Sequence, residues 1–223
     1  MKTSINHKLF AGIVNLVFCI LSEASAVTIH NASNDFGGSN PGGVWSYLYT
    51  STSDPSSTLN LLDSYHSNGD LDIWSSLSAG DPPSVVKNIS TGIIEGLQPG
   101  GIALHPGPAN QNAVLRFTVP DTSDYDLSIQ FFGGAAGDTD AYILLNGNTL
   151  SPLFYATTTN SSPLWENALS LISGDVIDIM VGSKGAYDSD TTPVHAVITA
   201  VPEPSSSALL IAAGVMFFAF RRR

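Results

Sequence analysis

Hydrophobic and polar side chains alternate one by one through much of the second half of the chain. In residues 125–131 every second position is Tyr, Leu, Ile or Phe, and the positions between them are Asp, Ser and Gln. Residues 114–119 and 176–181 show the same period of two, and residues 194–201 close the series. This period is typical of antiparallel strands that bury one face. The second half of the chain is therefore predicted to be a series of short β-strands.

Turn signals separate these segments. Asn146-Gly147 predicts a type I′ turn, and Gly174-Asp175 predicts that residues 169–172 turn back into residues 176–181. Residues 59–65 are the one segment for which we expect one or two helical turns. Weaker strand candidates in the first half are residues 27–30, 44–50, 72–74, 85–89 and 101–105. About ten short strands with turns between them predict an all-β fold, a single antiparallel jelly-roll-type β-sandwich.

The first 26 residues carry the three parts of a secretory signal peptide. Lys2 and Lys8 form a basic start, and an apolar run over residues 9–21 follows. Ala24 and Ala26 then give the small-x-small spacing of a cleavage site. An uncleaved membrane anchor is the alternative, but the apolar run is too short to span a bilayer. We therefore expect residues 1–26 to direct export and to be removed.

The last 23 residues form a second targeting segment. Pro202-Glu203-Pro204 precedes an apolar run over about residues 205–220, and Arg221, Arg222 and Arg223 end the chain. As a helix the run is about 24 Å long, which is short for a hydrocarbon core of about 30 Å. The arginines are expected to stay cytoplasmic and to stop the helix in the membrane, with the body of the protein on the other side.

This tail resembles the PEP-CTERM sorting signal of Gram-negative bacteria, which has a Pro-Glu-Pro motif, a short hydrophobic helix and a basic end in this order. The resemblance implies that an exosortase, a membrane-embedded cysteine protease–transpeptidase, recognises Pro202, Glu203 and Pro204 and processes the tail. It also implies an inner-membrane precursor that ends at the cell surface or in the extracellular matrix, in company with exopolysaccharide. We accordingly expect a signal peptide at 1–26, a β-sandwich domain at 27–200 and a sorting tail at 201–223.

Charge and cysteine content exclude several kinds of partner and site for residues 27–200. Seventeen acidic residues in this span face three basic ones, Lys87, Arg116 and Lys184. Phosphate binding needs a basic face, so nucleic acid is excluded as a partner. The one cysteine, Cys19, lies in the signal peptide. A disulfide, a thiolate nucleophile and a Cys-ligated metal are therefore excluded from the body.

The body resembles the jelly-roll, carbohydrate-binding-module-like domains that exported PEP-CTERM proteins often carry. The segments behind this resemblance are, in chain order, Trp45-Ser46-Tyr47, Leu104-His105-Pro106-Gly107, residues 114–120, Asn146-Gly147 and residues 173–177. Aromatic rings on such a domain stack on sugars, and Trp45 and Trp165 are the candidate ligand residues. For Trp45 we favour burial in the core, where large aromatic side chains bury large apolar areas, and Trp165 is the better candidate for exposure.

Paired aspartates suggest a metal. Asp138 and Asp140 follow a glycine, and Asp188 and Asp190 precede two threonines. Calcium takes six to eight oxygen ligands, which loop carboxylates and backbone carbonyls supply. These four residues therefore predict one structural calcium, with ordinary solvated turns as the alternative.

Sequence motifs of the common enzyme classes are missing from the chain. Glu95 and Glu166 are the candidate pair for a glycosidase, which needs two carboxylates across a sugar. His105, in a proline-rich loop, is the candidate base, and a structural histidine is its alternative. Our hypothesis is a non-enzymatic surface or matrix protein that associates with exopolysaccharide. A secreted polysaccharide-active hydrolase and a purely structural matrix component remain as alternatives.

Overall fold

Fourteen strands lie in the part of the chain that the computed structural model describes, residues 26–76, 82–133, 138–158, 161–185 and 187–202. They are β1 (Thr28–Asn31), β2 (Trp45–Thr50), β3 (Leu59–Leu61), β4 (Ser64–Ser67), β5 (Leu71–Ser75), β6 (Ser84–Asn88), β7 (Ile102–His105), β8 (Ala113–Thr118), β9 (Ser123–Phe131), β10 (Thr139–Leu145), β11 (Phe154–Thr157), β12 (Leu164–Leu171), β13 (Val176–Ser183) and β14 (Thr192–Val201). Within the described ranges no helix is long and apolar enough to cross a membrane.

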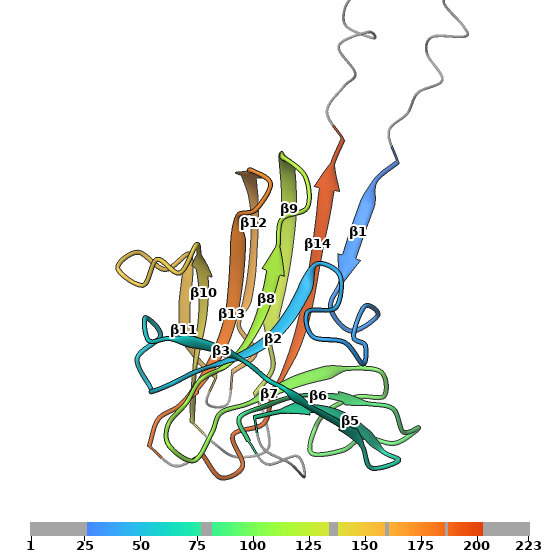
Figure 1. Ribbon diagram of the computed structural model, residues 1–223, viewed down its shortest axis with the longest axis vertical. Coiled ribbons are helices and arrows are strands. Elements are labelled where there is room, and N and C mark those ends of the chain that lie inside the picture. The colour runs from blue at the N-terminus through green and yellow to red at the C-terminus, as the bar shows by residue number, and fades with distance from the viewer. Residues whose placement is uncertain (1–25, 77–81, 134–137, 159–160, 186, 203–223) are drawn as a thin grey trace, which may run out of the picture. The chain divides into compact units, whose positions relative to one another are not determined.

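The strands form a sandwich of two antiparallel sheets. The first sheet has eight strands in the order β12-β9-β14-β7-β6-β5-β4, with β1 also paired to β14. The second sheet has six strands in the order β11-β10-β13-β8-β2-β3. Figure 1 shows β13, β8 and β2 of the second sheet beside one another, and β5, β6 and β7 of the first sheet together at the lower right. The predicted all-β sandwich is confirmed.

The core lies between the inner faces of the two sheets, where the period-two pattern places it. Tyr125, Leu127, Ile129 and Phe131 of β9 are all buried in it, and the polar residues between them are not. The second sheet contributes Phe117 and its neighbours from β2, β8, β10 and β13. Each large apolar side chain buried in this way contributes about 1.5–3 kcal/mol to folding.

Two predicted turns have different outcomes. Asn146 and Gly147 have φ values of 53° and 68°, and the NH of Asn148 donates to the carbonyl of Leu145 at 3.0 Å, so the type I′ turn is confirmed. The predicted hairpin at Gly174-Asp175 is wrong, because β12 belongs to the first sheet and β13 to the second. Local turn chemistry fixes the reversal of the chain but not the sheet that the next strand joins.

Residues 59–65 form strands rather than the predicted helical turns. β3 pairs with β2 in the second sheet, and β4 pairs with β5 in the first. Between them Leu62 is buried, and its carbonyl accepts a hydrogen bond from Nδ2 of Asn40 at 2.7 Å. Pairing with strands of both sheets therefore overrides the weak local pattern.

Both predicted targeting segments fall almost entirely outside the described residues. Of the cleavage motif only Ala26 is described, and Ala24 is not. Of the sorting motif only Pro202 is described; Glu203, Pro204, the segment 205–220 predicted to be a helix and the arginines at 221–223 lie outside the described residues. Residues Ile29–Ala200 form one compact unit.

Candidate functional site

The connection between β6 and β7, residues 89–101, folds back over the outer face of the first sheet. Asn88 is fully buried at its base. Its Nδ2 donates to the carbonyls of Gly92 at 2.8 Å and Leu97 at 2.9 Å, and its Oδ1 accepts from the NH of Ser90 at 2.9 Å. The Asn88 side chain thus satisfies three backbone groups that lie outside the strands, and these hydrogen bonds hold the connection in place.

Three strands supply an apolar floor beneath this connection. The register places Ile73 of β5 opposite Val86 of β6, and Val86 opposite Ala103 of β7. Val85 faces the sandwich core, so strand alternation turns Val86 to the outer face. Leu97 of the connection packs on this row. The first sheet is therefore covered on both faces at this point.

A polar row lies beside the apolar floor. Ser84 is opposite His105 in the register of β6 and β7, and Thr191 stands just before the start of β14, where Thr192 pairs with Leu104 of β7. Nδ1 of His105 lies 2.8 Å from the carbonyl oxygen of Pro106. Because a carbonyl only accepts, Nδ1 carries the hydrogen of this bond, and Nε2 of a neutral ring is then an acceptor.

Glu95 projects from a tight turn at the tip of the connection. Ile94 and Leu97 exchange two backbone hydrogen bonds, of 3.1 and 2.8 Å, across it. The φ values of Glu95 and Gly96 are 48° and 84°, as in a type I′ turn. Asn, Asp or Gly is usual where Glu95 stands, and strained positions of this kind cluster at functional sites.

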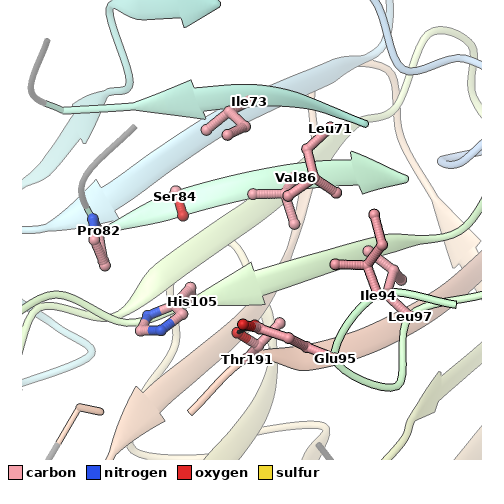
Figure 2. A pocket seen from close by; sticks show the side chains of 10 residues that line it. All are labelled: Leu71, Ile73, Pro82, Ser84, Val86, Ile94, Glu95, Leu97, His105 and Thr191. Atoms are coloured by element: carbon pink, nitrogen blue, oxygen red, sulfur yellow. Dashed lines mark hydrogen bonds between the residues drawn. The ribbon is translucent and has the colours of Figure 1, made fainter. Parts of the chain in front are cut away.

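The sheet and the connection line a half-open cavity of about 220 Å³. Its lining consists of Leu71, Ile73, Pro82, Ser84, Val86, Ile94, Glu95, Leu97, His105 and Thr191. Figure 2 shows Leu71, Ile73 and Val86 on neighbouring strands and the polar groups of Glu95, His105 and Thr191 along one side. Thr191 Oγ1 donates to Oε2 of Glu95 at 3.4 Å. The volume is below the ~300–1,000 Å³ of sites for drug-sized ligands, so the cavity suits one ring or one chain end.

The loop before β14 links this cavity to the predicted aspartates. The ring of Tyr187 makes an edge-on contact with that of His105, with centroids 6.2 Å apart. Asp190, next to Thr191, is 1% exposed, and neither of its carboxylate oxygens has a hydrogen-bond partner. Burial first, and then the charges of Asp138 and Asp188, raise the pKa of Asp190 to about 6.

Asp140 does not belong with the other three predicted calcium ligands. Its Oδ1 accepts from the hydroxyl of Tyr155 at 2.9 Å, and burial together with its charge raises the pKa of Tyr142 to about 12. It therefore stands with two tyrosines on β10 and β11. In the described part of the chain, no three His, Cys, Asp or Glu side chains are grouped closely enough to hold a metal ion.

The two candidate tryptophans lie in different surroundings. Trp45 is 0% exposed; its Nε1 donates to Asp35 at 3.1 Å, and its ring packs on that of Phe117. It is a core residue, and it offers no face to a ligand. Trp165 of β12 is half-buried and packs against the core from the edge of the first sheet, so its role in ligand binding stays a prediction.

Glu95 and Glu166 do not face one cavity. Glu166 lies on β12, where it accepts from Ser128 Oγ at 3.2 Å, and β9 and β14 separate β12 from β7. Glu95 is the one carboxylate among the described residues that line the cavity. A glycosidase needs two carboxylates about 5–9.5 Å apart, so this pair does not provide the geometry that the hydrolase alternative requires.

Glu95 and His105 of the cavity were predicted from the sequence, whereas Ser84, Thr191 and the apolar floor were not. One signal was available, because β5 and β6 each contain two adjacent apolar residues, Ile73-Trp74 and Val85-Val86. Adjacent apolar residues in a short strand indicate burial on both faces. Such strands need a covering segment, and residues 89–101 provide it.

Among protein-family models, the PEP-CTERM protein-sorting motif matches residues 200–223. The chain ends in a PEP-CTERM sorting motif. This motif implies export and processing by an exosortase, and the match covers the tail alone. No curated protein matches the chain.

Solved structures similar to this chain include several carbohydrate-binding modules. A family 35 module from Clostridium thermocellum is 11% identical, with 78% of this chain and 98% of the module covered and a TM-score of 0.32. A Podospora anserina mannanase that carries a family 35 module is 13% identical, with 80% and 29% covered and a TM-score of 0.30. Murine APRIL is 13% identical, with 70% and 99% covered and a TM-score of 0.29. The body therefore resembles these domains distantly, and this likeness decides no ligand.

Proposed function

We propose that this chain is an exported protein of a Gram-negative bacterium, sorted through its tail to the cell surface or extracellular matrix, and that its body is a non-catalytic module that binds exopolysaccharide. The observation that carries the proposal is the sorting motif at residues 200–223. In this account Pro202, Glu203 and Pro204 are the residues that exosortase recognises. The short helix and the three final arginines hold the precursor in the inner membrane until processing.

The cavity beneath residues 89–101 is the part of the body that we assign to ligand binding. Its apolar floor suits the C–H face of a sugar ring, and Glu95, His105, Ser84 and Thr191 supply hydrogen-bonding groups along one side. A small site of this kind takes one sugar unit or the end of a chain. The crossings of the chain between sheets, as at β12 to β13, support the jelly-roll type of sandwich that many sugar-binding modules share.

A non-catalytic role is supported by the single carboxylate in the described lining of the cavity. Glu95 accepts a hydrogen bond from Thr191 and suits an acceptor role toward sugar hydroxyls. Charged acceptors form hydrogen bonds worth about 1.5–3 kcal/mol, which corresponds to roughly tenfold or more in affinity.

Binding to glycans of the producing cell's exopolysaccharide tests this assignment. We expect Glu95→Gln and His105→Ala each to weaken binding at least tenfold, because each removes a polar group from the cavity. Glu166→Gln is the matched control, since Glu166 is a glutamate of the same domain outside the cavity. Isothermal titration calorimetry or affinity electrophoresis gives the dissociation constants.

Each alternative has its own outcome in this experiment. Equal weakening by Glu95→Gln and Glu166→Gln would place the ligand elsewhere on the body. No glycan binding by the wild-type protein would favour a purely structural matrix component. Release of reducing sugar from exopolysaccharide, abolished by Glu95→Gln, would establish a hydrolase instead.

A further inference from the structure

Three segments of the body meet beside the start of β14. Thr139 at the start of β10 is opposite Ser183 at the end of β13. The hydroxyl of Thr139 also lies 3.1 Å from that of Thr192, the first residue of β14, and both threonines are buried. Asp138 directly precedes Thr139, and Asp190 lies two residues before Thr192. The loops that carry these two aspartates are therefore neighbours.

Of the three aspartates in these loops, Asp138, Asp188 and Asp190, only Asp190 is buried. It is 1% exposed, and both of its carboxylate oxygens lack a hydrogen-bond partner. The charges that act on it, those of Asp138 and Asp188, are both negative, and both residues are exposed. A buried carboxylate is normally hydrogen-bonded or paired with a cation, because its burial otherwise costs several kcal/mol. This carboxylate has neither partner among the described residues, and its acidic neighbours add repulsion.

We infer that Asp190 is the buried ligand of a divalent cation, calcium, whose charge is balanced further by Asp138 and Asp188 at the surface of the same loops. Calcium suits the site because it takes oxygen ligands in flexible geometry and accepts backbone carbonyls and water beside carboxylates. Magnesium demands a nearly regular octahedron and keeps most of its water. Among the described residues no three His, Cys, Asp or Glu side chains are placed to ligate one metal ion together, so in this proposal backbone carbonyls and water complete the shell around Asp190. Asp140 is not part of this site.

A cation at Asp190 would support the cavity and would not contact the sugar. Thr191, which follows Asp190, donates to Glu95, and Tyr187 of the same loop contacts His105. A cation that fixes the loop before β14 would therefore hold in place both the hydrogen bond from Thr191 to Glu95 and the ring contact between Tyr187 and His105.

The test compares four full-length proteins in detergent: wild type, Asp190→Asn, Asp188→Asn and Asp140→Asn. Calcium binding is measured by equilibrium dialysis with radioactive calcium, and thermal unfolding is followed with excess chelator and with millimolar calcium. We expect the wild type to bind one calcium and to melt about 5–10 °C higher when calcium is about a hundredfold above its Kd. Asp140→Asn is the matched control and should behave as the wild type.

Asp190→Asn should lose calcium binding and the shift in melting temperature, because the neutral amide keeps the shape but not the charge. Asp188→Asn removes an exposed charge, so the protein stays folded, and its calcium affinity should fall severalfold. Equal binding by wild type and Asp190→Asn, loss of binding only in Asp140→Asn, or no calcium bound by the wild type at millimolar concentration would each overturn the inference. If Asp190→Asn does not fold, the result for Asp188→Asn against Asp140→Asn decides.

Discussion

Arg116 and Asp178 form an ion pair on the outer face of the second sheet. They are directly opposite in the register of β8 and β13, with Nε to Oδ1 at 2.6 Å and the second nitrogen to Oδ2 at 2.9 Å. Asp178 is fully buried, whereas the Arg116 side chain is 24% exposed. Hydrogen bonding to Asp178 is the main cause that raises the pKa of Arg116. Asp178 is thus a buried carboxylate whose charge is balanced by a side chain of the protein. Asp190, in contrast, has no such partner among the described residues.

Removing one partner of this pair should destabilise the body strongly. Asp178→Ala leaves a half-buried guanidinium without its partner, and we expect a loss of about 3–5 kcal/mol in the free energy of unfolding. The double variant Arg116→Met with Asp178→Leu should regain most of this loss, because apolar residues of similar size fit beside Val114 and Met180. Urea unfolding measures both. A double variant as unstable as Asp178→Ala would contradict the account.

Individual residues show how much of the candidate site can be predicted from the sequence. Glu95 and His105 could be identified from the sequence, since residues 27–200 contain only two glutamates and four histidines. The separation of Asp140 from Asp138, Asp188 and Asp190 was not, because it depends on Tyr155 of the paired strand. Paired aspartates in a sequence give the composition of a metal site but not the side chains that reach it.

Among the structural elements, the connection from β6 to β7 contains the strained turn at Glu95, and the same turn forms part of the edge of the cavity. A positive φ at Glu95 is unfavourable for a Glu and tolerated by Asn. Glu95→Asn should therefore raise the free energy of unfolding by up to about 1 kcal/mol and still weaken glycan binding, since the shorter side chain does not reach the rim.

The same pair of measurements provides the control. Asn146→Gly changes the other type I′ turn, which lies away from the cavity, and should leave glycan binding unchanged. If Glu95→Asn lowered stability, the backbone would not be the strained part of this turn. If it left binding unchanged, the carboxylate would have no part in the ligand site.

Most of the strands could be predicted from the sequence, but the sheet that each connection leads to could be predicted less well. The alternation in β8, β9 and β13 arises from one buried face per strand, and it marks these strands in the sequence. β3 and β4 are short and have little alternation, so only their partners β2 and β5 make them strands. The crossing from β12 to β13 depends on long-range hydrogen bonds to Val119, which no local pattern contains.

For the whole molecule, the sequence is most informative at its C-terminal end. The order of Pro-Glu-Pro, apolar run and arginines is continuous in sequence, so a linear pattern is sufficient to identify the sorting motif, and the match at residues 200–223 confirms it. The cavity of the body is assembled from β5, β6, β7, the connection of residues 89–101 and the loop before β14. Its lining residues are distant in sequence, and their proximity follows only from the fold.

Sorting of the Glu203→Ala variant is the measurement that tests the central claim most directly. The change leaves the apolar run and the arginines intact, so a simple membrane anchor would not be affected by it. Ser206→Ala, just beyond the motif, is the matched control. In a host with its exosortase intact, cell fractionation and immunoblotting give the amounts of precursor and of surface or matrix protein.

The account predicts that Glu203→Ala accumulates as full-length precursor in the inner membrane, with the surface form reduced severalfold. Wild type and Ser206→Ala should both be processed to a shorter form and reach the surface. Equal surface yields from wild type and Glu203→Ala would contradict the claim that the tail is a sorting signal, and would leave it a short membrane anchor.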